Sequence, residues 1–212
     1  ALLNQGRLAF EYGGVMNEAL NVLNRYLHKY PESVHCAEVQ SLIVAAYYKS
    51  NNYDLAYDII KSIENPSKDL RTTLQKVCVY RAVSEIEKGN YDVARQLLDE
   101  SMEIGLSAKF KALSFYWLGE LAMLNGNYDE ACAMYKDYIR SAPRSDKEYL
   151  MAHYGLGYAY FAKNDYENAT LAFNSFLSGH EFGDKVVIKR ASGEYVAKEH
   201  VRYVYDAQNR FA

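Results

Sequence analysis

One short phrase returns four times along this chain of 212 residues, and its spacing limits what the chain can fold into. The phrase reads NNYDLA at 51–56, GNYDVA at 89–94, GNYDEA at 126–131 and NDYENA at 164–169. Successive copies are 37 or 38 residues apart. A fixed period of this length is typical of small repeated units, each of which buries its apolar face only against its neighbours. The period therefore predicts a stack of repeats, not a chain folded around one core.

The phrase itself is typical of a tight bend between two helices. Apolar residues before Gly126 recur every three or four positions, as on one face of a helix. Gly126 can take the left-handed backbone that ends a helix, and Asn127 can cap the next one. Asp129 then lies in a first helical turn, where its charge meets the positive end of the helix dipole. We expect ten helices in antiparallel pairs over 1–178 and no sheet, with bends at 51–53, 89–91, 126–128 and 164–166.

Composition excludes several classes of partner. The chain is 50% hydrophobic and 24% charged, with a formal net charge of -3, which is an ordinary soluble composition. Its 24 basic and 27 acidic residues give no general attraction to nucleic acid or anionic lipid. No apolar stretch approaches the ~18–20 residues that cross a bilayer. We expect no nucleic-acid partner and no direct membrane insertion; the oligomeric state is left open.

Motifs for catalysis or metal binding are missing from the sequence. No two of the five histidines stand at ligand spacing with a carboxylate, and no glycine-rich phosphate loop is present. The cysteines, at wide spacing, suit apolar positions inside helices: Cys36, Cys78 and Cys132. We therefore expect no catalytic residue, no metal, no cofactor and no enzymatic activity.

Two of the repeated units carry a family resemblance. The third full unit has, in step, Phe115, Leu118, Gly119, Ala131, Tyr135 and Pro143; the fourth has Leu156, Gly157, Tyr160, Ala169 and Phe173. This pattern resembles the tetratricopeptide repeat (TPR) family. The resemblance implies an all-α, right-handed superhelical solenoid of antiparallel helix pairs. Arg7 and Arg81 depart from the pattern, since they occupy positions where the family has small or apolar residues.

The domain organisation follows from the same resemblance. Residues 1–178 are expected to form five TPR-like hairpins, and residues 179–212 a degenerate sixth repeat or C-terminal capping helices, with a loop at 179–184. The segment KYPES at 29–33 also resembles envelope-associated TPR proteins of Gram-negative bacteria. That second resemblance favours the bacterial cell envelope or periplasm over the cytoplasm, and localisation is otherwise left open.

The family resemblance also implies a concave surface lined by the first helix of each hairpin. Several positions that hold the family's clamp for a terminal carboxylate carry the wrong residues here, among them Ser41, Val79 and Tyr154, so that clamp is not expected. What remains is an aromatic-rich groove, strongest from 113 to 161. The expected binding residues are Tyr116, Trp117, Glu120, Tyr154, Tyr158 and Phe161.

The aromatics of this groove have two interpretations. They can pack between neighbouring helices, as buried aromatics commonly do. They can also stay exposed and bind a peptide. A mixture is expected, with a set in the core, Phe115, Tyr128, Tyr135 and Tyr166, and a set at the surface, Tyr116, Tyr154 and Tyr158.

The leading hypothesis for function is a non-enzymatic scaffold that binds a protein or peptide segment in this groove. A carbohydrate- or small-ligand-binding module is an alternative, because tyrosine and tryptophan also stack on sugar rings. A further alternative is the docking region of a larger multi-domain enzyme or envelope complex. A small-ligand site needs a pocket with converging polar groups, whereas a peptide site needs a surface that continues over several units.

Overall fold

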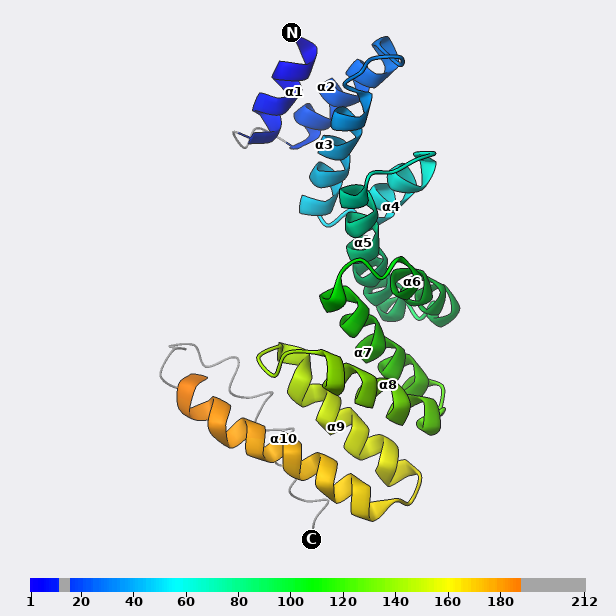
Figure 1. Ribbon diagram of the computed structural model, residues 1–212, viewed down its shortest axis with the longest axis vertical. Helices are drawn as coiled ribbons and strands as arrows, with labels where there is room; N and C mark the ends of the chain where they lie inside the picture. Colours follow the sequence, from blue (N-terminus) through cyan, green and yellow to red (C-terminus); the bar gives the residue numbers. More distant parts are fainter. Residues whose placement is uncertain (12–15, 188–212) are drawn as a thin grey trace. The chain divides into compact units, whose positions relative to one another are not determined.

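The computed structural model describes residues 1–11 and 16–187, which contain ten α-helices and no β-strand (Figure 1). The helices are α1 (Leu2–Glu11), α2 (Met16–Lys29), α3 (Cys36–Lys49), α4 (Tyr53–Ser62), α5 (Lys68–Glu87), α6 (Tyr91–Ile104), α7 (Ala108–Leu124), α8 (Tyr128–Ser141), α9 (Lys147–Ala162) and α10 (Tyr166–Val187). The predicted all-α class is thereby confirmed.

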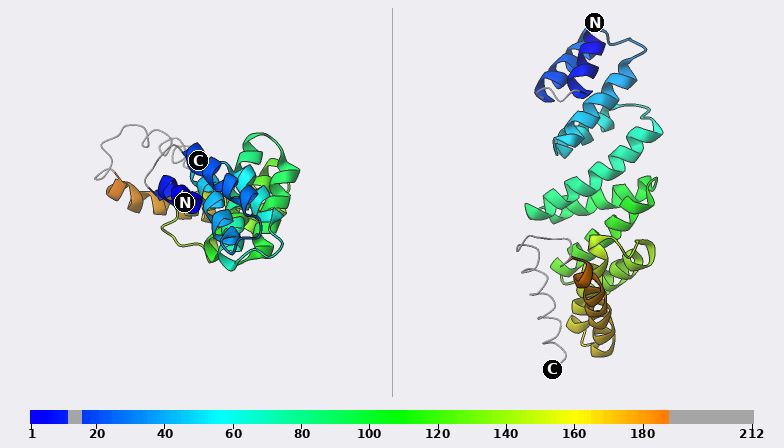
Figure 2. Two further views of the ribbon diagram at one scale, coloured as in Figure 1. Left: turned by 90° about the horizontal axis from the view of Figure 1, so that it is seen from above. Right: turned by 90° about the vertical axis from the view of Figure 1, so that its left-hand side faces the viewer.

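The chain divides into two compact units, Ala1–Phe110 and Lys111–Ala212, which we call unit 1 and unit 2. In unit 1, each helix from α1 to α5 contacts the next one, and α5 lies along α6. In unit 2, α9 packs between α8 and α10. Figures 1 and 2 show the consecutive helices paired as hairpins inside each unit. Each unit thus buries its apolar faces between neighbouring helices, as the repeat period predicts.

The repeated phrase forms the bends that follow α3, α5, α7 and α9, one residue earlier than predicted. Its first residue has a positive φ in all four copies: Asn51 at 57°, Gly89 at 81°, Gly126 at 72° and Asn164 at 61°. Glycine and asparagine are the residues that most readily adopt this left-handed backbone. The next amide then bonds back across the turn, as from the N–H of Asn127 to the carbonyl of Ala122 at 2.8 Å. This arrangement closes the preceding helix, and the tyrosine of the phrase begins the next one.

The tyrosines of the phrase are less buried than the sequence predicts. Tyr128 is half-buried, and Tyr166, expected in the core, is 56% exposed. The prediction for Tyr166 is wrong because its ring turns back over its own bend, where its hydroxyl donates to Oδ1 of Asn164 at 2.9 Å. Tyr53 makes the same contact with Asn51 at 2.8 Å. In the two copies that begin with asparagine, the phrase tyrosine therefore stabilises the local turn.

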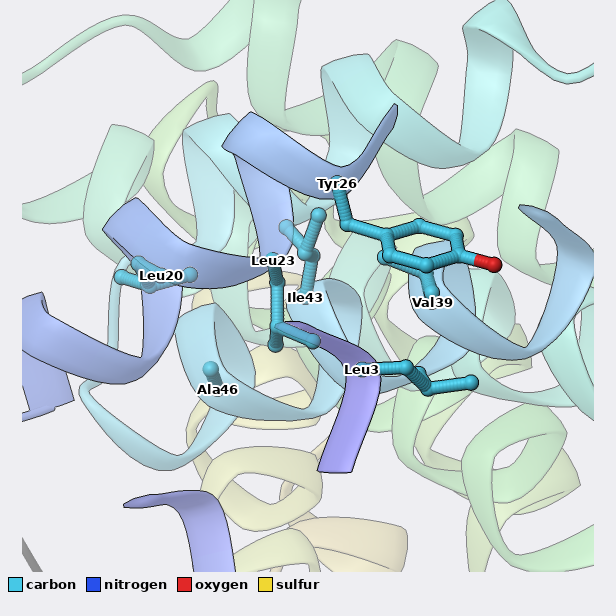
Figure 3. Packing of buried hydrophobic residues seen from close by; sticks show 7 residues of the cluster. All are labelled: Leu3, Leu20, Leu23, Tyr26, Val39, Ile43 and Ala46. Carbon is cyan, nitrogen blue, oxygen red and sulfur yellow. The ribbon is translucent and has the colours of Figure 1, made fainter. Parts of the chain in front are cut away.

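The first core of unit 1 joins α1, α2 and α3. Figure 3 shows its buried side chains: Leu3, Leu20, Leu23, Tyr26, Val39, Ile43 and Ala46. Gly6 lets α1 approach α2, since a Cβ there would lie 2.5 Å from Cδ2 of Leu23. Arg7, the charged departure from the family pattern, donates from Nε to Glu38 at 2.6 Å. The charge is thus accommodated at the edge of this core.

Polar side chains buried elsewhere in unit 1 are also partnered. Gln75, which is fully buried, accepts from the N–H of Ser107 at 2.7 Å and donates to its carbonyl at 3.1 Å. Arg81, the second departure from the family pattern, lies 4.6 Å from the ring centre of Tyr57 and pairs with Asp54 at 2.6 Å. The two bonds of Gln75 satisfy a group that would otherwise destabilise the helix stack, whereas the buried Nε of Arg81 has the ion pair but no hydrogen bond.

The end of the described chain differs from the sequence-based expectation. The loop expected at 179–184 is part of α10, which continues to Val187. Residues 188–212, expected to belong to a degenerate repeat or a cap, lie outside the described residues. The division of the chain at residue 178 stays a prediction.

Candidate functional site

Tyr135 of α8 is the centre of unit 2. It is 1% exposed, and its ring lies against glycines of two other helices. A Cβ at Gly119 of α7 would come within 2.8 Å of this ring, and a Cβ at Gly155 of α9 within 2.6 Å. No side chain larger than hydrogen fits there without displacing the ring. Tyr135 therefore holds α7 and α9 next to each other.

The hydroxyl of Tyr135 hydrogen-bonds to Glu120, one of the predicted site residues. It donates to Oε1 of Glu120 at 2.7 Å, and the Tyr116 hydroxyl also hydrogen-bonds to this carboxylate. Burial raises the pKa of Glu120, while the two hydroxyls oppose this effect by stabilising the charged form. Among the residues that the structure describes, no cation is paired with Glu120. A half-buried carboxylate thus lies among aromatic rings.

Tyr116, expected at the surface, is instead 8% exposed. Its ring centre lies 5.2 Å from that of Trp117, 5.4 Å from Tyr138 and 6.2 Å from Tyr135. The prediction is wrong because α8 presents two large rings to α7, and Tyr116 packs over both. Burial raises the pKa of Tyr116, and the charges of Glu120 and Glu148 raise it further. Tyr116 therefore packs underneath the candidate site residues as part of the core, and little of its surface is accessible to a partner.

Tyr154 and Tyr158 of α9 combine the two roles considered for the aromatics. Both are half-buried, and their ring centres lie 4.9 Å apart. Tyr154 packs against Phe176 of α10 at 5.2 Å, and Tyr158 against Phe173 at 5.3 Å. One side of each ring therefore belongs to the α9/α10 core, and the remainder is accessible.

Phe161 and Trp117 complete the predicted set, and both are half-buried. Phe161 contacts the exposed Tyr166 edge-on at 5.5 Å. Spacings of three, four and seven residues place side chains on one helix face, which groups Trp117 with Glu120 on α7 and the three α9 aromatics with one another. We call the five accessible members the α7/α9 surface: Trp117, Glu120, Tyr154, Tyr158 and Phe161.

Unit 1 contains at least three hollows that sequence reasoning missed. One, about 720 Å³, is open and lies where residues 1–4 face Tyr26, Tyr30 and His35. The Tyr26 hydroxyl is already bonded to Ser33 at 2.7 Å, and Tyr30 and His35 are exposed. Another, about 260 Å³, is polar and lies between the bend at 50–52 and Arg81. The one sequence signal for it was the arginine at an apolar family position.

Reactive groups give little support for chemistry in the described part of the chain. Burial raises the pKa of the Cys78 thiol to about 12, so it stays protonated and unreactive at neutral pH. Burial, with Arg144 nearby, lowers the pKa of His153. Over 1–11 and 16–187, no three His, Cys, Asp or Glu side chains are grouped to hold a metal ion. None of the described helices is both long and apolar enough to cross a bilayer.

Comparison with known families identifies the repeat. The profile of the tetratricopeptide repeat matches residues 80–146 and 118–182, and a second tetratricopeptide profile matches residues 1–33. Together these matches cover more than half of the chain. The chain belongs to the tetratricopeptide repeat family. The predicted TPR-like solenoid is thereby confirmed, and the fold is that of a protein-interaction scaffold.

Individual relatives are distant. The chain is 26% identical over 165 residues to the RNA polymerase-associated protein CTR9 of Caenorhabditis elegans, a match that covers 76% of this chain and 14% of that protein. The crystal structure of MamA protein resembles it with a TM-score of 0.59 at 18% identity, over 87% of this chain and 92% of MamA. BtubC (BKLC) from P. vanneervenii gives 0.57 at 14% identity, over 100% and 85%. These structural likenesses establish the fold alone.

Proposed function

We propose that this TPR protein is a non-enzymatic scaffold that binds a segment of another protein on the α7/α9 surface. The observation that carries the proposal is the set of α9 aromatics, Tyr154, Tyr158 and Phe161, which share one helix face and stay partly accessible. Tyr135 contacts both Gly119 of α7 and Gly155 of α9, which supports placing Trp117 and Glu120 of α7 on the same surface. Accessible aromatic groups of this kind supply most of the energy at protein interfaces.

The chemistry of the surface favours an internal, mainly apolar segment. A terminal carboxylate needs cationic partners, and this surface has an anion, Glu120, in their place. Amidating the C-terminus of a bound peptide should therefore change its affinity little. Aromatic anchors suit the apolar face of a helix or an extended segment.

A docking role inside a larger assembly is compatible with this proposal. CTR9, the distant relative, is described as RNA polymerase-associated, and the present chain spans about 14% of its length. A repeat array of this size is one part of that protein. The same α7/α9 surface would then hold a neighbouring protein of the assembly in place.

The small-ligand alternative has weaker support. The large hollow of unit 1 has the volume for a ligand, about 720 Å³. A small-molecule site also needs convergent polar groups. Here the lysine, glutamate and histidine at its rim, Lys29, Glu32 and His35, are all exposed. The open α7/α9 surface is therefore the preferred site.

The test is a binding screen with an array of fluorescein-labelled synthetic peptides that carry apolar anchors. Binding of a hit is followed by fluorescence anisotropy with wild-type protein, Phe161→Ala and Trp117→Ala. We expect each variant to weaken binding by about fivefold or more, since a good aromatic anchor contributes over ~1 kcal/mol. Tyr91→Ala is the matched control, because Tyr91 is a 36% exposed aromatic that begins a helix in unit 1.

These positions avoid a difficulty that Tyr154 and Tyr158 would bring. Both of those rings pack against α10, so truncating them would disturb the fold as well as the surface. Circular dichroism of each variant checks folding. Unchanged binding by folded Phe161→Ala and Trp117→Ala, or an equal loss with Tyr91→Ala, would place the site elsewhere.

A further inference from the structure

We propose that Glu120 receives a cationic side chain, a lysine or arginine of the bound segment, beside the ring of Trp117. The inference rests on the proposed function and adds to it the chemical class of the partner residue. It commits the α7/α9 surface to a segment in which one basic residue stands among apolar ones.

The first reason is that the Glu120 carboxylate lacks a counter-charge. Both of its partners in the described structure are tyrosine hydroxyls, on Tyr135 and Tyr116. Removing a carboxylate from water is unfavourable unless a cation compensates for the lost hydration. Burial has raised the pKa of this group, as expected of an acid that lacks such a cation. A ligand cation would supply the missing interaction.

Four basic side chains in the described part of unit 2 are engaged elsewhere. Arg140 pairs with Asp137 at 2.7 Å, Lys147 with Glu148 at 3.4 Å, and Lys163 with Asp129. Lys136 lies 5.0 Å from the ring centre of Tyr160. These four basic side chains therefore have partners, and none of those partners is Glu120.

A second and independent observation is the hydroxyl of Tyr138. The residue is fully buried, and its hydroxyl has no hydrogen-bond partner. The Tyr138 ring contacts Tyr116, whose hydroxyl binds Glu120. Buried polar groups are rarely left unpaired, so an unpaired hydroxyl on a ring that contacts Tyr116 is an unusual feature of unit 2. Glu148 and Asp146 add negative charge around Tyr138.

Aromatic rings and negative charge together select cations. Trp117 stands three residues before Glu120 on α7, so the two side chains lie on the same side of the helix. The face of a tryptophan attracts an ammonium or guanidinium group, and the attraction grows when water is excluded. Glu120 would add a charge-assisted hydrogen bond. An anionic or uncharged side chain gains neither contribution.

The experiment uses short labelled peptides with identical apolar flanks, taken from a hit of the array. They differ at one central position, which holds lysine, arginine, norleucine or glutamate. Norleucine keeps the aliphatic stem of lysine without its charge. Trp117 is the single tryptophan of the sequence, so its intrinsic fluorescence reports on binding at the site itself. For wild-type protein we expect lysine and arginine to bind about tenfold tighter than norleucine, and glutamate to bind weakest.

The variant Glu120→Gln should remove this preference. Glutamine is close in shape and its oxygen still accepts from Tyr135, so the fold should persist. The matched control is Glu103→Gln, which removes the same charge from an exposed position on α6. The control should keep the wild-type preference. Circular dichroism checks both variants.

The possible failures are distinct. The inference is wrong if the norleucine peptide binds wild-type protein as tightly as the lysine peptide, or if Glu120→Gln keeps the preference for lysine. In either case, a change of Trp117 fluorescence on peptide binding would still support the proposed function. If no peptide changes the Trp117 signal or the anisotropy, the proposed function and the inference both fail. The wild-type peptide series alone decides the inference if Glu120→Gln does not fold.

Discussion

Each unit contains a cluster of tyrosines, and the two clusters differ in burial and charge. In unit 1, Tyr48, Tyr53 and Tyr80 are half-buried; Tyr53 stacks on Tyr80 at 5.3 Å, and Lys76 lies 5.8 Å from the centre of the adjacent Phe110 ring. In unit 2, a cluster of Tyr116, Tyr135 and Tyr138 is buried, and the hydroxyls of Tyr116 and Tyr135 bind Glu120. The cluster of unit 1 is therefore partly accessible and has a lysine nearby, whereas the cluster of unit 2 is buried and binds a glutamate.

The bond between Tyr135 and Glu120 depends on a pair of positions that recurs along the chain. Gly119 and Tyr135 of the third unit correspond to Val44 with Ile60, Ala82 with Leu98, and Gly157 with Phe173. Both glycines face an aromatic ring, whereas the valine and the alanine face aliphatic side chains. All these partners are nearly or fully buried. Among these pairs, Gly119 with Tyr135 alone places a hydroxyl where a carboxylate can bind it.

Tyr135→Ala should give the largest loss, because it removes this hydroxyl and leaves a large cavity. We expect the free energy of unfolding to fall by about 3–5 kcal/mol, as for other buried aromatics. Chemical denaturation followed by circular dichroism measures it. Leu98→Ala is the matched truncation in unit 1 and should cost about 2–5 kcal/mol. A loss below that of an exposed truncation such as Leu171→Ala would mean that Tyr135 does not hold α7 and α9 together.

Tyr116→Ala should come next, at about 2–4 kcal/mol, because Tyr116 is 8% exposed and packs on two rings of α8. The comparison is Tyr166→Ala, which removes a ring that is 56% exposed and should cost less than about 1 kcal/mol. This order reverses the one that the sequence suggested. Equal losses of stability for the two variants in the same denaturation experiment would contradict the assignment of Tyr116 to the core.

Gly119→Val tests the pairing of Gly119 with Tyr135 directly. A valine brings methyl groups into the Tyr135 ring, which lies 2.8 Å from the position of a Cβ, and overpacking of this kind costs about 1–3 kcal/mol. The double variant Gly119→Val with Tyr135→Ile reproduces the Val44–Ile60 pair of unit 1 and should recover much of the loss. A double-mutant cycle measures the coupling. Strict additivity of the two changes would show that the positions do not compensate each other.

The smallest effect is expected from the charge of Glu120. Because burial raises the pKa of Glu120, the folded state holds the proton more tightly than the unfolded chain. Its contribution to stability is complete below the ordinary carboxyl range and is lost as pH rises through the folded-state pKa. Glu120→Gln should therefore match wild type at acidic pH and be slightly more stable at neutral pH. Thermal unfolding at both pH values measures this difference. The groups that face the Glu120 carboxylate are the hydroxyls of Tyr116 and Tyr135, and the charge of Glu148 on α9 raises the pKa of Tyr116.

The sequence by itself determined the repeat, the helix pairs and the bends. These features are local, since the left-handed residue and the first-turn acid of the phrase lie within a few positions of one another. The capping bond expected of Asn127 is not formed by its side chain, whereas Asn52 accepts one from the N–H of Leu55. The bends fall one residue before their predicted places because the phrase tyrosine already belongs to the following helix. The expectations drawn from composition and from the lack of catalytic motifs likewise came from the sequence alone. The fold class and the family follow from this level.

The tertiary structure decided which aromatic rings are buried and what Glu120 contacts. Tyr116 occupies a position that faces a groove in the family pattern, yet it is covered because Tyr138 of another helix fills the space beneath it. Tyr166 has the same spacing as the other phrase tyrosines, yet it is exposed. Burial depends on which side chain a neighbouring helix presents across the contact, and periodicity along one helix does not contain that information. For the same reason the bond from Tyr135 to Glu120, fifteen residues away, became visible only when α7 and α8 were packed together.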